Sequence, residues 1–334
     1  MEGGPIIKKL HETLRLLIQM TFSNYVKISL SILLVALFFG FFYKEFKENW
    51  ESIRTLHVVI NWEYLILGIL MTIANYLCTT LSWHIGINYF DSHTKLTFTQ
   101  SIALVNISQL GKYIPGKFWS YLVQIYWLAS KGVPKTTILY LNIVIALLTT
   151  LVSILLGCLL LLVLPGWQHL KIELLIFIGL LLLLNFVLLK KTFLRLLIEM
   201  FSRITKQQIS FYQFSVRRIM SMQLICIVGA IFWALAGCFI AMSIGFRLDN
   251  LRILSISGAM LLGDAIGFLI LIAPGGLGVR EGTMFLILKS VGIIQFALIF
   301  PIFVRLVSIA TDLIMGIVSV SLMARSTIRK RVSV

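Results

Sequence analysis

Two short stretches decide how this chain is organised: Gln109-Leu110-Gly111-Lys112-Tyr113-Ile114-Pro115-Gly116-Lys117 and Ala273-Pro274-Gly275-Gly276-Leu277-Gly278-Val279-Arg280-Glu281-Gly282. Each places helix-breaking residues and charge inside a run that is otherwise apolar enough to enter a lipid bilayer. A broken backbone at membrane depth is tolerated only where protein buries it or a water-filled cavity hydrates it. Ionisable groups among apolar spans usually face a polar pathway. We therefore expect the function to reside in these two stretches.

The composition is that of a polytopic membrane protein, because 59% of the 334 residues are hydrophobic and only 13% are charged. The net charge of +16 would fit nucleic-acid binding, but the basic residues cluster beside apolar spans, as the positive-inside rule describes. We therefore expect no nucleic-acid partner. The cysteines lack metal-ligand spacing and the histidines are scattered, so neither predicts a metal site or a cofactor. The four cysteines are Cys78, Cys158, Cys226 and Cys238.

Six apolar runs reach the ~17 to 25 residues that a membrane crossing needs. They are residues 25–43, 62–83, 137–164, 172–189, 219–245 and 293–323. Two further apolar stretches, 101–130 and 257–288, are interrupted at mid-length, and each is predicted to form two half-helices. The predicted fold is therefore all-α, with six full spans and two re-entrant broken helices. The alternative is that the broken stretches are ordinary hairpins, which gives eight full spans.

Basic residues set the predicted orientation, because they precede the first span, join the fourth span to the fifth and follow the last one. Segments of this kind stay in the cytoplasm, so both termini are predicted to be cytoplasmic and the protein to lie in the cell (inner or cytoplasmic) membrane. Residues 1–24 carry apolar side chains on one face and charged ones on the other, which predicts an interfacial helix. Residues 324–334 are predicted to be a basic cytoplasmic tail.

The two broken stretches also indicate an internal repeat within a single membrane domain, residues 1–334. Pro115-Gly116 aligns with Pro274-Gly275, and each motif is preceded by two spans and followed by one. With three full crossings in each half, the second copy runs through the membrane in the opposite direction to the first. Repeat A (25–164) and repeat B (171–323) therefore predict the inverted-repeat plan of many transporters. In the eight-span alternative the likeness reflects hydropathy alone, but Lys289 would then lie in mid-bilayer, an unfavourable position.

Charge is uneven between the two motifs. No carboxylate occurs between Asp91 and Glu173, so Lys112 and Lys117 form a site of uncompensated positive charge for which an anion is the natural complement. The glycines would let a head group approach the backbone, and half-helix N-termini would add N–H donors. The predicted substrate-binding residues are Lys112, Tyr113, Pro115, Gly116, Lys117, Trp119, Pro274, Gly275, Gly276, Gly278, Arg280 and Glu281. The alternative is that the two lysines only extend their charged ends to the membrane–water interface and bind no ligand.

A second group of charged residues, on the apolar spans themselves, is predicted to line a polar pathway or gate. It consists of Asp264, Lys289, Arg305 and Asp312. Asp312 lies on the same helical face as Arg305, so these two residues are also candidates for a structural ion pair.

The two broken stretches resemble motifs of a known family. Gly-Lys-Tyr-Ile-Pro-Gly-Lys-x-Trp at 111–119 and Pro-Gly-Gly-Leu-Gly-Val-Arg-Glu-Gly at 274–282 resemble the lysylphosphatidylglycerol synthase transmembrane region, also called the flippase-like family. In its two-part synthases the membrane half is associated with moving aminoacylated phospholipid between leaflets, and a soluble C-terminal half makes that lipid. This sequence ends just after its last span, so we expect a stand-alone member without synthase activity. The resemblance implies lipid translocation without choosing the lipid.

Catalytic motifs are missing: the sequence has no Walker motif, no His-Glu-x-x-His and no Gly-x-Ser-x-Gly. The leading hypothesis is a flippase-like protein that translocates or binds an anionic lipid or a polyprenyl-linked lipid intermediate through a midplane polar cavity. One alternative is an integral-membrane glycosyltransferase on a lipid-linked sugar, which would have to use Glu45, Glu48 and Glu51. The other is a non-catalytic membrane partner of an envelope glycosyltransferase or another envelope-biosynthesis enzyme.

Overall fold

The computed structural model of the chain describes residues 59–90, 95–113, 119–188, 215–270 and 274–332, together with Gly40, Tyr43, Lys44 and Lys47. Every regular element in that part of the chain is a helix, which confirms the predicted all-α class. The predicted interfacial helix, 1–24, and almost all of the predicted first span, 25–43, lie outside the described residues and stay predictions.

Six segments of the described chain are long and apolar enough to cross a membrane. They contain α3 (Trp62–Phe90), α6 (Lys135–Leu161), η2 (Pro165–Leu170) with α7 (Lys171–Leu188), α9 (Val216–Ser243), α10 (Asn250–Leu269) and α12 (Ile294–Val332). Five of them match predicted spans. The sixth, α10, begins well before residue 257 and is longer than the half-helix expected there. Helix α12 continues through most of the predicted basic tail, as far as Val332, and the cytoplasmic location of that tail stays a prediction.

The two broken stretches form helical hairpins. Hairpin A consists of α4 (Phe98–Leu110), η1 (Gly111–Tyr113) and α5 (Trp119–Ala129), and hairpin B consists of α10, η3 (Pro274–Gly276) and α11 (Val279–Ser290). Helices α4, α5 and α11 contain 13, 11 and 12 residues, which is about 16 to 20 Å at a rise of roughly 1.5 Å per residue. A bilayer core is about 30 Å thick, so none of these three helices crosses it alone.

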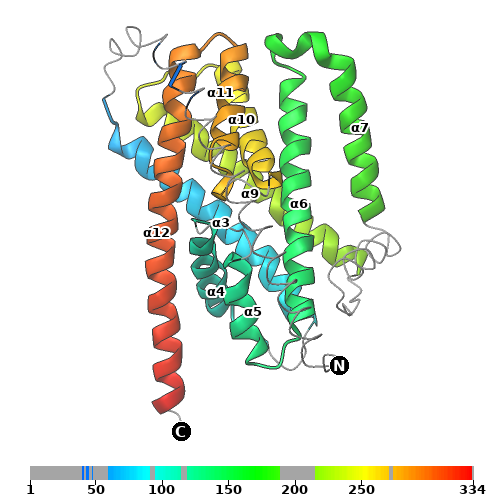
Figure 1. Cartoon of the computed structure of the whole chain (residues 1–334), viewed down its shortest axis with the longest axis vertical. Coiled ribbons are helices and arrows are strands. Elements are labelled where there is room, and N and C mark those ends of the chain that lie inside the picture. The colour runs from blue at the N-terminus through cyan, green and yellow to red at the C-terminus, as the bar shows by residue number, and fades with distance from the viewer. Residues whose placement is uncertain are drawn as a thin grey trace, which may run out of the picture.

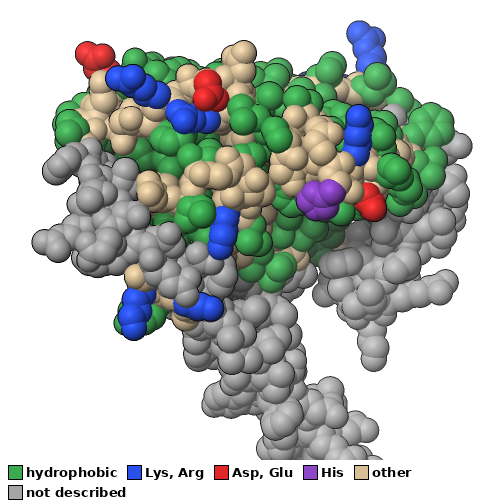
Figure 2. Space-filling model, turned by 90° about the horizontal axis from the view of Figure 1, so that it is seen from above, with side chains coloured by type: hydrophobic (Ala, Val, Ile, Leu, Met, Phe, Trp, Pro, Cys, Tyr) green, Lys and Arg blue, Asp and Glu red, His purple; other side chains and the backbone are tan. Residues whose placement is uncertain are grey.

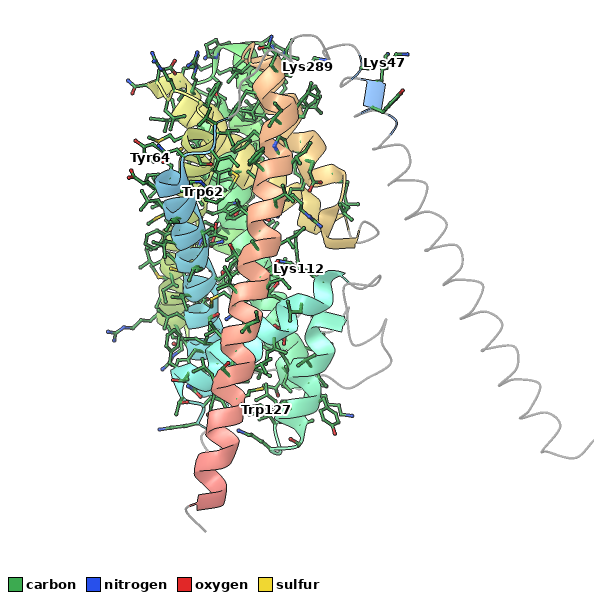
Figure 3. All side chains as sticks on the ribbon, turned by 90° about the vertical axis from the view of Figure 1, so that its left-hand side faces the viewer. Lys47, Trp62, Tyr64, Lys112, Trp127 and Lys289 are labelled. Carbon is green, nitrogen blue, oxygen red and sulfur yellow. The ribbon has the colours of Figure 1, made fainter. Side chains whose placement is uncertain are left out.

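The hairpins open at opposite ends of the bundle, and their tips meet between those ends (Figures 1 and 3). Helices α3 and α9 are antiparallel, since the Asn61 amide donates to the Ser243 carbonyl over 2.8 Å at one end of the pair. Hairpin A follows the end of α3, and hairpin B follows the end of α9. Each half of the chain therefore consists of a helix, a hairpin and a second helix: α3, hairpin A and α6 in the first half, and α9, hairpin B and α12 in the second. The elements of one half run antiparallel to the matching elements of the other. This is the arrangement expected of an inverted repeat. The repeat itself stays a prediction.

Small residues bring α3 and α9 together at the centre of the molecule. A Cβ atom at Gly68 would lie 2.9 Å from Ile240 Cγ1, and one at Gly229 would lie 3.1 Å from Asn75 Oδ1. Such contacts allow close backbone approach where lipid gives no hydrophobic drive for helices to associate. The crossing of α3 and α9 forms one wall of the space into which the hairpin tips project.

The outside of the described bundle is apolar, as expected for helices that lipid surrounds. Helix α7 stands at the edge and packs mainly on α6 (Figure 1), and most of its large apolar side chains are exposed. Figure 2 looks onto the end where hairpin B opens, and there basic and acidic side chains both appear among hydrophobic ones. In the described part of the chain, polar side chains also gather inside the bundle.

Candidate functional site

The tips of the two hairpins border a cavity of about 300 Å³ inside the bundle. Helices α3, α6, α9 and α12 complete its walls. Pockets that hold small ligands usually measure about 300 to 1,000 Å³, so this cavity has room for a small head group. Figure 3 places Lys112, at the tip of hairpin A, near the middle of the molecule's long axis.

An ion pair joins hairpin A to the second half of the chain. Lys112 Nζ lies 2.7 Å from Asp312 Oδ2, and the Asp312 side chain has no solvent exposure. The sequence-based expectation of uncompensated charge is therefore wrong for Lys112, because its carboxylate comes from α12 and not from the neighbouring sequence. A count of nearby acidic residues along the chain cannot find such a partner. Asp312 fixes the tip of hairpin A against α12.

A second charged contact of α12 fixes hairpin B. Arg305 Nη1 donates to the Gly275 carbonyl over 3.0 Å and lies 3.4 Å from Glu281 Oε1. The other carboxylate oxygen of Glu281 accepts the Gly278 N–H at 2.7 Å, which caps the start of α11. Arg305 and Asp312 do share a helical face, but the partners seen here lie on different hairpins. Helix α12 thus holds both tips.

Arg280 carries a donor that the described residues do not use. Its Nη1 lies 3.6 Å from Asp264 Oδ1, a long contact to a carboxylate whose side chain is 51% exposed. Its guanidinium lies over the Trp233 ring, 4.8 Å from the centroid, in a cation–π contact. Its Nη2 is buried and has no hydrogen-bond partner among the described residues. A guanidinium held at one side with a free donor on the other is suited to an anionic oxygen.

The glycines of hairpin B let backbone segments touch. A Cβ atom at Gly276 would lie 2.9 Å from the Gly267 carbonyl oxygen, and one at Gly275 would lie 3.2 Å from Arg305 Nη2. Both glycines have positive φ, +71° and +56°. Close approach is therefore realised between the arms of the hairpin and α12, whereas approach of a ligand to these glycines stays a prediction.

A set of uncharged polar side chains, which the sequence-based reasoning missed, lines the rest of the cavity. Asn142 donates to Gln124 Oε1 at 2.8 Å, and Thr149 and Ser153 follow Asn142 on the same face of α6. In the sequence, this polar stripe along an otherwise apolar span was the signal that could have revealed the polar lining. The uncharged polar residues that line the cavity are Asn75, Tyr76, Thr79, Trp83, Asn106, Ser108, Gln109, Gln124, Asn142, Thr149, Thr150, Ser153, Trp233 and Ser308.

The predicted site residues are only partly brought together. Six of them line the cavity: Lys112, Asp264, Gly275, Gly276, Arg280 and Arg305. Lys289 lies at the far end of α11, away from the cavity, with its Nζ 5.3 Å from the Phe285 ring centroid (Figure 3). Gly278, Glu281 and Asp312 are described but do not line the cavity. Only the backbone is described for Tyr113, Trp119 and Pro274, and Pro115, Gly116, Lys117, Glu45, Glu48 and Glu51 lie outside the described residues. Within the described chain no three His, Cys, Asp or Glu side chains gather as a metal site requires.

Comparison with known families identifies the chain. The model of the lysylphosphatidylglycerol synthase TM region matches residues 26–316. The chain belongs to this family. Because the match covers most of the sequence, the resemblance seen in the two motifs is confirmed, and the protein is a multi-pass membrane protein of a family linked to lipid-related processes. A comparison with curated proteins found no match.

Proposed function

We propose that this member of the lysylphosphatidylglycerol synthase TM-region family binds and translocates an anionic lipid or a polyprenyl-linked lipid intermediate. The head group enters the cavity between the hairpins while the tails remain in the bilayer. Arg280 carries the proposal, because its buried Nη2 lacks a protein partner at a cavity wall. A buried donor without a partner costs about 1–3 kcal/mol, and a phosphate oxygen would remove that cost.

The arms of the hairpins support a re-entrant arrangement. Helices α4, α5 and α11 are too short to cross alone, and hairpins A and B open at opposite ends (Figure 3). Two discontinuous helices that meet near the midplane would give a substrate site reachable from either leaflet, as in transporters built from inverted repeats. The apolar outer surface leaves the interior as the route for a charged head group.

The contacts of α12 suggest how access would alternate. Asp312 binds the tip of hairpin A through Lys112, and Arg305 binds the tip of hairpin B through the Gly275 carbonyl and Glu281. Release of one tip, with the other still bound to α12, would open the cavity toward one side only. A lipid phosphate that competes for Lys112 or Arg280 would couple its own arrival to that release.

Arg280→Gln tests the proposal. Loss of a charge-assisted hydrogen bond, worth roughly 1.5–3 kcal/mol, should weaken binding of phosphatidylglycerol about ten- to a hundredfold. Folding should survive, because the Asp264 carboxylate left behind is 51% exposed. The measurements are lipid binding by native mass spectrometry, melting temperature in detergent, and movement of fluorescent lipid between leaflets of reconstituted liposomes.

Arg252→Gln is the matched control, since Arg252 also pairs with an aspartate, Asp249 at 3.3 Å, but lies on the surface at the start of α10. It should leave binding and transport unchanged. Equal lipid binding by well-folded Arg280→Gln and the parent protein would refute the role of Arg280. A nucleotide-sugar donor added to the same liposomes tests the glycosyltransferase alternative, because new glycolipid would appear only if the chain is a transferase.

A further inference from the structure

The lining of the cavity is divided chemically between the helices that form it. The charged lining residues, Lys112, Asp264, Arg280 and Arg305, belong to the hairpin tips and to the part of α12 beside them. The lining residues on α3, α4, α5 and α6 include no Asp, Glu, Lys or Arg in the described chain. Amides and hydroxyls dominate that region instead. A ligand that fills the cavity therefore meets charge from the hairpin tips and α12, and neutral hydrogen-bonding groups from α3, α4, α5 and α6.

The neutral region offers donors and acceptors that the protein itself does not use. Asn142 Nδ2 donates to Gln124 Oε1 and to the Ile138 carbonyl, which leaves Asn142 Oδ1 and Gln124 Nε2 without partners in the described chain. Trp83 is 2% exposed, and its indole nitrogen has no hydrogen-bond partner among the described residues. Buried polar groups are normally hydrogen-bonded, so the Trp83 indole nitrogen indicates a polar occupant, and the two amide groups offer it a donor and an acceptor.

A ligand rich in hydroxyl groups matches this lining. Each hydroxyl of a ligand both donates and accepts, and so do the amides of Asn75, Gln124 and Asn142. The hydroxyls of Thr79, Ser108 and Thr149 donate to carbonyls of their own helices and can still accept a hydrogen bond from a ligand. A cationic head group fits poorly, since an ammonium moved into the neutral region would lose its hydration without gaining a carboxylate. The volume of about 300 Å³ limits the head group to a small one.

We infer that the substrate is a lipid whose phosphodiester carries a small, uncharged, hydroxyl-rich head group, either a single sugar or a polyol. The phosphate contacts Arg280 and the hydroxyls contact the Gln124–Asn142 region. This inference rests on the proposed function, because it assigns the substrate class of the same cavity.

Four short-chain lipids with identical tails test the inference on the purified full chain by native mass spectrometry. Phosphatidylinositol carries a phosphodiester and a ring of hydroxyls, phosphatidylmethanol carries the same charge without hydroxyls, lysyl-phosphatidylglycerol carries ammonium groups, and phosphatidylcholine is the background probe. We expect phosphatidylinositol to bind at least tenfold more tightly than phosphatidylmethanol, and lysyl-phosphatidylglycerol more weakly than phosphatidylinositol.

The double variant Gln124→Met with Asn142→Leu removes the neutral contacts while keeping similar side-chain shape, and exchange of both partners of a buried hydrogen bond is close to neutral for folding. It should bring phosphatidylinositol to within about twofold of phosphatidylmethanol, whose own binding stays unchanged. Gln295→Met, on an exposed residue outside the cavity, is the control.

The outcomes separate this inference from the proposed function. Equal binding of phosphatidylinositol and phosphatidylmethanol, or tightest binding of lysyl-phosphatidylglycerol, overturns the head-group inference and leaves anionic-lipid binding intact. Binding of every anionic lipid no tighter than phosphatidylcholine overturns both. A double variant that keeps the full preference for phosphatidylinositol shows that the hydroxyls bind elsewhere and also overturns the inference.

Discussion

Hairpins A and B both place a tip at the cavity, but different ionic contacts hold the two tips. Hairpin B carries its own charges of both signs, because Glu281 caps α11 and Asp264 faces Arg280. In hairpin A the only charged side chain described, Lys112, is neutralised from α12 by Asp312. Hairpin B therefore has ionic contacts of its own in addition to those with Arg305 of α12, whereas Lys112 of hairpin A is paired with a residue of α12.

The difference indicates which tip moves more easily. Separation of hairpin B from α12 breaks the contacts of Arg305 with Gly275 and Glu281, but it leaves Glu281 bound to the Gly278 N–H. Separation of hairpin A breaks the contact between Lys112 and the fully buried Asp312 side chain, unless a ligand or water replaces it. An anionic head group is one such replacement for Lys112, so we expect the opening of hairpin A to depend more strongly on substrate.

The largest expected effect is an all-or-none difference in labelling at the two open ends. In a background without Cys78, Cys158, Cys226 and Cys238, exposed Gln295 beside hairpin B and exposed Lys135 beside hairpin A are each replaced by cysteine. An impermeant thiol reagent should label Gln295→Cys in intact cells and Lys135→Cys only after permeabilisation.

Each other labelling pattern has a distinct meaning. Labelling of both positions from the same side would contradict entry of the hairpins from opposite sides. The reversed pattern would keep opposite entry but contradict the predicted cytoplasmic termini. Gln295 is a cleaner probe than Ser290, because the Ser290 hydroxyl accepts a hydrogen bond from Trp167 Nε1 at 2.8 Å.

Lys112→Met should cause the largest loss of stability, about 3–5 kcal/mol, because it leaves the buried Asp312 carboxylate without its ammonium partner. The double variant Lys112→Met with Asp312→Leu should recover most of the loss, since a buried pair can often be exchanged for apolar residues. Melting temperatures of the two variants in detergent measure this. A double variant no more stable than Lys112→Met would show that the pair does not account for the loss.

The sequence predicted the helical class, most spans and the two breaks, because long apolar runs and Pro-Gly pairs act locally on the backbone. It missed the partner of Lys112 and the neutral lining of the cavity. The Lys112–Asp312 contact joins residues far apart in the sequence, and one sequence carries no sign of which buried charges meet. The polar stripe of Asn142, Thr149 and Ser153 was readable by helical spacing, but isolated polar residues in apolar spans also occur as ordinary structural contacts.

A smaller loss of stability is expected from Gly276→Ala in the tip of hairpin B. The positive φ of +71° alone costs a residue with a side chain about 1–3 kcal/mol, and the new Cβ would lie 2.9 Å from the Gly267 carbonyl oxygen. Gly282→Ala is the control, because a Cβ atom there meets nothing within 4 Å and its φ is not positive. Equal melting temperatures for the two alanine variants would show that the arms of hairpin B separate freely.

Asp264→Asn should have the smallest effect on stability, within about 1 kcal/mol, because half-exposed ion pairs contribute little. Its effect on binding should be opposite in sign to that of Arg280→Gln. Asp264 Oδ1 lies 3.6 Å from Arg280 Nη1 and is the carboxylate that a lipid phosphate must displace or share. Without this competitor, phosphatidylglycerol should bind severalfold more tightly, and Asp249→Asn, at the surface pair with Arg252, should change nothing. Weaker binding by Asp264→Asn would mean that Asp264 orients Arg280 instead of competing for it, and Arg280 would then depend on its partner as Lys112 depends on Asp312.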